Sequence, residues 1–263
     1  MRFLFLKNIG LISAALPSWN LAKPILRGKN PPCTEPLPRL KPNILRANER
    51  RRTTNTIKLA LQAAQDLFPD QPLEDDISAV FTSSEGDLDI VDSICSALAM
   101  PERPVSPTQF HNSVHNAPAG YWSIAAGCHG ASISIGALEG SFASGLIEAA
   151  TQTVVNSSPT VLISYDWPPP DAMRNSISIE SPFAVAMLLS PDDKNALAEI
   201  SLSTQPYGTL SALMDNSLEQ LRMGSPAARS LPLLHSVACG IQQDIILPYL
   251  PKLHLSVGIK PCF

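Results

Sequence analysis

The chain has 263 residues, of which 44% are hydrophobic, and a formal net charge of −4. Its length suits one domain or a tight pair of domains, its charge argues against nucleic-acid binding, and no segment has the roughly eighteen consecutive apolar residues of a membrane span. The five cysteines form no CxxC motif, which is typical of reduced thiols in a cytoplasmic protein.

The N-terminal residues 1–19 combine an apolar run with two early basic residues, Arg2 and Lys7. Such a pattern is compatible with a secretory signal peptide. Lys7 and Asn8, however, interrupt the apolar run, and no small-x-small cleavage site follows it. We therefore expect a buried strand here and keep the signal peptide as the alternative.

Proline dominates residues 31–42, which predicts an extended arm rather than a helix. The apolar residues of segment 52–68 recur on one helical face and predict a helix, followed by a loop at 69–76. Directly before this helix, the sequence RANERRR at 46–52 concentrates basic charge. It indicates either a site for an acidic partner or a solvated helix start.

Strands and helices alternate along the rest of the chain. We expect strands at 78–84, 131–140 and 159–167, helices at 85–100 and 141–155, and an antiparallel pair of strands at 181–190 and 197–203. After residue 205 the pattern weakens, and we expect a helix at 209–222 and further helix between 225 and 250. This alternation predicts an α/β fold in which helices cover a central sheet. The glycines form no nucleotide-binding fingerprint, so no cofactor is expected.

The segment FHNSVHNAPAGYWSI, residues 110–124, is preceded by SPT and followed by a strand, a small-residue helix and VLISYD at 161–166. This arrangement resembles the ketosynthase-like subunits of aryl polyene pathways, which are relatives of β-ketoacyl synthases. In type II polyketide systems such a subunit is called a chain-length factor. The resemblance implies a truncated thiolase-like fold, layered α-β-α. Residues 1–205 would be a nearly complete thiolase half, and residues 206–263 a reduced C-terminal segment packing on the same core.

A condensing enzyme needs an activated cysteine at a strand-to-helix turn, where the helix N-terminus lowers the thiol pKa. Cys128 is followed by strand-like alternation, whereas the strand-to-helix junction comes later, at Glu139. The resemblance places Glu139 at the position of the nucleophile, and its spacing to the strand at Thr160 fits the family. A carboxylate cannot usefully be acylated by a thioester. We therefore expect no catalytic nucleophile at this turn.

Two further comparisons with catalytic ketosynthases also indicate a non-catalytic subunit. Neither His235 nor His254 lies in a segment like those that carry the catalytic histidines of ketosynthases, and the chain is shorter than a complete condensing enzyme. The resemblance thus implies a heterodimer with a full-length ketosynthase. Such a pair elongates polyene or fatty acyl chains on an acyl carrier protein, and this chain shapes the tunnel.

The resemblance places the histidine-rich segment 111–130 beside the subunit interface and the substrate tunnel. The residues expected at the interface or tunnel are His111, Asn112, His115, Asn116, Tyr121 and Trp122. The two aromatic residues are large enough to anchor a partner. Ordinary core packing is an equally good interpretation for both of them.

Two other hypotheses remain for this segment. In the first, Cys128 is the nucleophile of an acyltransferase or thioesterase, with His111, His115 or His129 as the base. In the second, His111 and His115 share one helical face and hold a structural metal. Asn112 stands where the zincin motif has glutamate, so our preferred interpretation contains no metal.

Overall fold

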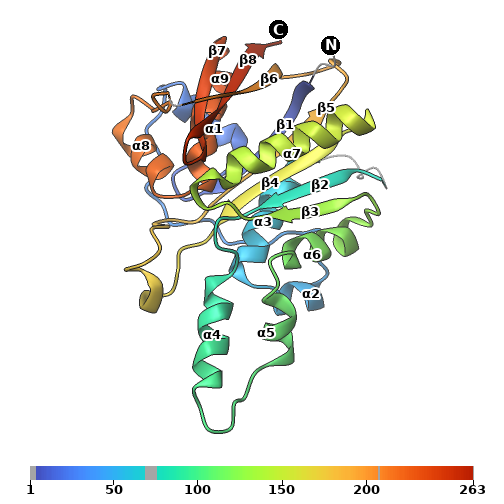
Figure 1. Ribbon diagram of the computed structural model, residues 1–263, viewed down its shortest axis with the longest axis vertical. Coiled ribbons are helices and arrows are strands. Elements are labelled where there is room, and N and C mark those ends of the chain that lie inside the picture. Colours follow the sequence, from blue (N-terminus) through green and yellow to red (C-terminus); the bar gives the residue numbers. More distant parts are fainter. Residues whose placement is uncertain (1–3, 69–75, 207, 263) are drawn as a thin grey trace.

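The computed structural model describes residues 4–68, 76–206 and 208–262. Within these residues the chain forms one eight-stranded mixed sheet in the order β3-β2-β4-β5-β1-β6-β8-β7, with helices on both faces (Figure 1). The layered α-β-α arrangement predicted from the sequence is confirmed. None of the helices in the described part of the chain has both the length and the apolar character needed to cross a bilayer.

The first five strands form one half of the sheet, and all of them except the edge strand β3 are largely buried. These strands are β1 (Leu4–Ser13), β2 (Ser78–Thr82), β3 (Ser132–Ile135), β4 (Thr160–Asp166) and β5 (Phe183–Ser190). Strands β3, β2 and β4 run parallel, whereas β5 is antiparallel to both β4 and β1. Every residue of β4 is buried, as expected for a near-continuous apolar strand covered on both faces.

The N-terminal segment forms the expected buried strand, β1, which lies in the interior of the sheet. A glycine in this strand allows a helix to approach closely, because a Cβ atom at Gly10 would lie 1.9 Å from the carbonyl oxygen of Ala63. Ala63 belongs to α3 (Asn55–Gln65), the helix predicted at 52–68. Most of the loop expected at 69–76 lies outside the described residues.

The expected pairing of the strands at 181–190 and 197–203 is wrong. Strand β6 (Ala198–Gln205) does not pair with β5, because β1 lies between them. On one edge of β1, Phe5 pairs with Ser190 of β5, and on the other edge Leu4 pairs with Ile200 of β6. Strands that are neighbours in sequence are therefore separated by the buried N-terminal strand, which bonds to both.

The C-terminal part contains less helix than the sequence predicts. The helix expected at 209–222 begins only at α8 (Asn216–Met223), where the Asp215 side chain accepts a hydrogen bond from the Leu218 backbone and caps the helix. A second helix, α9 (Leu231–Cys239), follows the short 3₁₀ helix η3 (Ala227–Ser230).

The segment after α9 is a hairpin of two strands rather than helix. Its strands are β7 (Gln243–Leu250) and β8 (Leu253–Pro261), and β8 joins the edge of β6. Alternating burial in β7 places Ile245 and Leu247 in the core while their neighbours are less buried. The further helix expected between 225 and 250 therefore ends at Cys239, and the rest of that range is mostly strand.

Two hydrophobic clusters lie on the two faces of the sheet. One contains α1 (Trp19–Leu26), α7 (Ser141–Asn156) and α9, and the other contains α3 and α6 (Ala117–Ala126). The extended arm at 31–42 packs Leu37 and Leu40 against the second cluster.

The described residues also contain three further α-helices and the short 3₁₀ helix η2 (Asp171–Met173). The three α-helices are α2 (Ala47–Arg52), α4 (Leu88–Leu98) and α5 (Pro107–Asn112). Helices α4 and α5 project together from the body of the molecule (Figure 1).

Candidate functional site

The turn from β3 into α7 is the strand-to-helix junction singled out by the sequence. It consists of the short 3₁₀ helix η1 (Leu138–Gly140), after which α7 begins at Ser141. Leu138 has a φ of 48°, a left-handed conformation that is uncommon for a non-glycine residue. Ser141 holds the turn, because its hydroxyl accepts from the Ala137 backbone and donates to the Leu138 carbonyl. A strained backbone conformation such as that of Leu138 is typical of functional sites.

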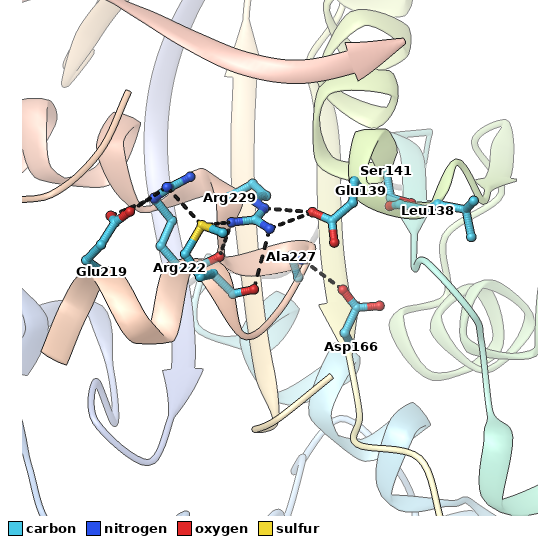
Figure 2. Close-up of polar contacts among 9 residues, drawn as sticks. Leu138, Glu139, Ser141, Asp166, Glu219, Arg222, Ala227 and Arg229 are labelled. Atoms are coloured by element: carbon cyan, nitrogen blue, oxygen red, sulfur yellow. Dashed lines mark hydrogen bonds and ion pairs between the residues drawn. The ribbon is translucent and has the colours of Figure 1, made fainter. Parts of the chain in front are cut away.

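The Glu139 side chain binds a buried arginine from the C-terminal part of the chain. Atoms Nε and Nη2 of Arg229 lie 2.8 and 2.7 Å from the same carboxylate oxygen of Glu139, Oε2 (Figure 2). The side chain of Arg229 is 8% exposed, whereas that of Glu139 is 57% exposed. The acid at this turn therefore neutralises a cation that solvent hardly reaches.

Arg229 is fixed from its other side by the end of α8. Its Nη1 donates to the carbonyl oxygen of Arg222 at 2.9 Å, and its Nη2 lies 3.4 Å from that of Met223. Arg222 in turn binds both carboxylate oxygens of Glu219, which lowers the pKa of that carboxyl chiefly through the side-chain hydrogen bond. The pair Glu139–Arg229 thus belongs to a polar network that runs from η1 to α8 (Figure 2).

A second acid, Asp166 at the end of β4, holds the same C-terminal segment. One of its oxygens accepts from both the backbone (2.9 Å) and the hydroxyl (2.7 Å) of Ser84, and from the Ser83 hydroxyl at 3.2 Å. The other oxygen accepts from the Ala227 backbone at 2.7 Å (Figure 2). Burial raises the pKa of Asp166 to about 6, against the lowering effect of these hydrogen bonds.

The C-terminal hairpin closes on the same turn. A Cβ atom at Gly140 would lie 2.2 Å from the carbonyl oxygen of Tyr249 in β7, so only glycine fits there. Residues 222–230 and β7 therefore both pack against the junction between β3 and α7. The resulting site holds a carboxylate in an ion pair, which is a poor nucleophile for a thioester.

Cys128, the alternative nucleophile, is a buried thiol at the end of α6. It is 2% exposed and donates to the Ile77 carbonyl at 3.0 Å, whereas His129 beside it is exposed. This geometry is that of a structural cysteine.

Sγ of a different cysteine, Cys239, lies 3.6 Å from Nε2 of His235. Both residues line a pocket of about 470 Å³. Burial raises the pKa of this thiol and lowers that of the histidine, so both groups favour their neutral forms.

The two histidines proposed as metal ligands do not share a helix. His111 lies in α5, which ends at Asn112, and His115 lies in the connection to α6. The ring of His111 makes an edge contact with Tyr121, and Nε2 of His115 lies 3.3 Å from the Ser83 carbonyl. Across the described ranges, no three histidine, cysteine or acidic residues gather as a metal site would need.

Two residues expected at the interface or tunnel are buried within this chain instead. Asn112 donates to the Arg52 carbonyl at 2.8 Å and accepts from the Tyr121 hydroxyl at 3.1 Å. Trp122 is 1% exposed and packs edge-on against Phe81. Asn112 is thus bonded to α2 and α6 of its own chain and Trp122 packs on β2, so neither side chain is exposed on the surface of this chain.

The exposed side of the same region carries apolar residues that the sequence analysis missed. We use the name apolar patch for the exposed large apolar side chains of residues 110–138, namely Phe110, Val114, Ile124, Ile133 and Leu138. Ile124 and Phe110 are 72% and 69% exposed. The patch includes β3, which lies at the edge of the sheet. Phe110 and Val114 lie two residues before and two residues after the buried Asn112 in the sequence. This spacing could have shown which residues of the segment are exposed and which are buried.

A basic pocket of about 710 Å³ lies between the extended arm and helices α2 and α3. Its charged lining residues are Arg39, Lys41, Arg50, Arg51 and Lys58. Trp167 and Asn55 also line the pocket. Of the basic run RANERRR, Arg50 and Arg51 line this pocket beside three further cations, and Arg50 also donates to the carbonyl oxygens of Pro42 and Leu45.

The family model described as beta-ketoacyl synthase, N-terminal domain, matches residues 26–238, and the chain belongs to this family. A comparison with curated protein sequences gives no match.

Solved ketosynthase structures share the fold. The ketosynthase (ApeO) in complex with its chain length factor (ApeC) from Xenorhabdus doucetiae matches with a TM-score of 0.75 and 23% identity, over 97% of this chain and 99% of that one. The ishigamide ketosynthase/chain length factor gives 0.76 and 11%, over 99% and 100%. The type II acyl-carrier protein complex AntDE:AntF, with its ketosynthase bound to the hexaketide, gives 0.77 and 11%, over 100% of both chains. The thiolase-like ketosynthase fold implied by the resemblance is thereby confirmed.

We predict that Glu139→Ala destabilises the protein by about 1–2 kcal/mol, because Arg229 loses the partner of two charge-assisted hydrogen bonds while the exposure of Glu139 moderates the loss. Urea unfolding measures the change. Glu199→Ala is the matched control. Glu199 pairs with Lys260, whose side chain is 65% exposed where that of Arg229 is 8% exposed. The pair with Lys260 should therefore contribute under about 1 kcal/mol. Equal effects of the two substitutions would contradict a special role for the buried arginine.

We predict that Asp166 makes the protein less stable as pH rises from about 4 to about 6. Its folded-state pKa of about 6 exceeds the ordinary value of 3.8 for aspartate, so the protonated folded form is favoured below this window and the advantage is lost above it. The contribution is at most about 3 kcal/mol, because one pKa unit corresponds to about 1.4 kcal/mol. Urea unfolding of the wild type and Asp166→Asn at pH 5 and pH 7.5 measures the effect.

Two control variants accompany Asp166→Asn. Asp66→Asn should remove a similar but separate part of the pH dependence, because burial also raises the pKa of Asp66 to about 6. Asp192→Asn should leave the difference between pH 5 and pH 7.5 unchanged, because hydrogen bonding lowers the pKa of this exposed group. The prediction fails if Asp166→Asn keeps the full wild-type difference.

Proposed function

We propose that the chain is a non-catalytic ketosynthase-like subunit, a chain-length factor, that forms a heterodimer with an active β-ketoacyl synthase. The partner supplies the chemistry that elongates a polyene, as in aryl polyene pathways, or a fatty acyl chain on an acyl carrier protein. This chain completes the dimer and lines the tunnel. The observation that best supports this proposal is that the strand-to-helix turn holds Glu139 in an ion pair with buried Arg229.

The division of the chain fits this role. Residues 1–205 act as the ketosynthase-like half, and residues 206–263 act as a reduced segment that packs on the same core. In support, Leu231 and Val257 of the second part belong to one hydrophobic cluster with Leu6 of the first. All five cysteines are free thiols, which is consistent with a cytoplasmic complex.

The apolar patch is the surface that we assign to the ketosynthase. An edge strand exposes unpaired backbone groups, and exposed apolar side chains beside it mark a protein interface. Strand β3 and Ile133 supply the edge, while Phe110 and Ile124 add apolar area on α5 and α6. His111, Asn116 and Tyr121 lie in the same region and remain candidates for the interface or tunnel wall, since none of them is fully buried.

The basic pocket is the surface that we assign to the acyl carrier protein. A carrier presents acidic side chains and the phosphate of its pantetheine arm, and complementary charge accelerates such encounters. Arg50 and Arg51 lie on α2 at one wall of the pocket, and Lys58 extends from α3. Trp167 offers an apolar surface beside these cations.

We predict that Ile133→Lys and Phe110→Asp each weaken binding to the ketosynthase at least tenfold, because they bury a charge in an apolar interface. The chain is co-expressed with a full-length β-ketoacyl synthase from the same organism, and size-exclusion chromatography with light scattering measures the complex. Met214→Asp is the control, because Met214 is fully exposed outside the patch. A wild-type chain that never co-elutes with that ketosynthase would falsify the proposal.

We also predict that Arg50→Glu with Arg51→Glu slows chain elongation by the assembled pair at low salt, with a smaller effect at high salt because ions screen the attraction. The readout is the rate at which the carrier-bound product grows, measured by mass spectrometry. Arg174→Glu is the control, because Arg174 is exposed and does not line the pocket. Equal rates for the double variant and the wild type at low salt count against carrier docking in this pocket.

A further inference from the structure

A small cavity lies beneath the histidine-rich segment, between α3, the start of α4 and the connection from α5 to α6. The residues that line it are Thr56, Ile57, Gly86, Asp87, Asn112, Val114, His115, Pro118 and Tyr165. Its volume is about 10 Å³, counted as the space open to the centre of a water-sized sphere. A cavity of this size holds about one water molecule.

The phenol of Tyr165 lines this cavity. Tyr165 lies in β4 and is 1% exposed, and its hydroxyl has no hydrogen-bond partner among the described residues. A buried hydroxyl without a hydrogen-bond partner destabilises the folded state. Burial, followed by the charges of Asp166 and Asp87, raises the pKa of the phenol, so it stays a hydrogen-bond donor.

The carboxylate of Asp87 lines the same cavity from the start of α4. Its Oδ1 caps the helix by accepting from the Ile90 backbone at 3.2 Å. Its Oδ2 is buried and, like the Tyr165 hydroxyl, has no partner in the described part of the chain. Two residues that carry an unpartnered donor and an unpartnered acceptor among the described residues thus line a space about as large as one water molecule.

We propose that this cavity binds one ordered water molecule, which accepts a hydrogen bond from the Tyr165 hydroxyl and donates one to Asp87 Oδ2. Bound water of this kind makes two to four hydrogen bonds to buried polar groups that otherwise have no partner. The Thr56 hydroxyl and the His115 ring also belong to the lining and can satisfy the remaining positions of the water. The inference is independent of the proposed function.

The water would link three parts of the structure. Tyr165 belongs to the rigid sheet, Asp87 begins the projecting helix α4, and His115 lies in the connection between α5 and α6. The projecting pair of helices is therefore attached to the sheet through a hydrated polar contact as well as through apolar packing.

A crystal structure of the whole chain at about 1.5 Å resolution tests the proposal. We expect density for one water within about 2.6–3.2 Å of both Tyr165 Oη and Asp87 Oδ2. We expect this density to be lost in Tyr165→Phe and kept in Tyr121→Phe, whose hydroxyl bonds directly to Asn112. An empty cavity, or a direct bond between the Tyr165 hydroxyl and Asp87, overturns the proposal.

Thermal unfolding of the same variants provides a second test, because Tyr165→Phe should lower Tm if the cavity holds water and raise it if the cavity is dry. If water satisfies the hydroxyl, Tyr165→Phe leaves Asp87 Oδ2 without its partner and lowers Tm, and amide exchange in residues 88–98 rises at least threefold. If the cavity is dry, Tyr165→Phe removes a hydroxyl that was already without a partner, and Tm rises. A raised Tm together with unchanged exchange therefore contradicts the proposal.

Discussion

The ion pair between Glu139 and Arg229 is the interaction on which the arrangement of this protein depends. A buried guanidinium must be neutralised and its N–H groups bonded, because an unpaired buried charge is very costly. Glu139 supplies the charge, and the backbone carbonyl of Arg222 supplies a further acceptor. The acid at the junction of β3 and α7 thus acts across the fold, joining residues that are ninety positions apart in the sequence.

The position of the C-terminal segment follows from this pair and from Asp166. The two acids bind opposite ends of one short stretch, with Glu139 holding Arg229 and Asp166 holding the backbone of Ala227. Helix α9 and the hairpin β7–β8 continue from that stretch and pack on the same hydrophobic cluster as α7. Tyr249 then meets the turn at Gly140, where any side chain would collide with it. Polar contacts fix the segment in place, and apolar burial stabilises the result.

The sequence was most informative where a local pattern decides the structure. The apolar runs of β4 and β1 and the periodicity of α3 needed no knowledge of distant partners. The pairing of β5 with β6 failed because β1, almost two hundred residues away, lies between them. The hairpin β7–β8 was missed because its alternation is weak and its burial comes from packing against α9. Sequence spacing likewise selected Glu139 but could not identify Arg229, which only the folded chain brings to it.

The strained turn at Leu138 has a specific use in the proposed heterodimer. A left-handed non-glycine residue costs on the order of 1–3 kcal/mol and persists only when its surroundings impose it. Here Ser141 and the ion pair of Glu139 impose it, and the Leu138 side chain is 63% exposed as part of the apolar patch. In the proposed heterodimer, the strain therefore presents an apolar contact rather than a nucleophile. The same backbone shape would thus be retained for binding a subunit that carries out the chemistry.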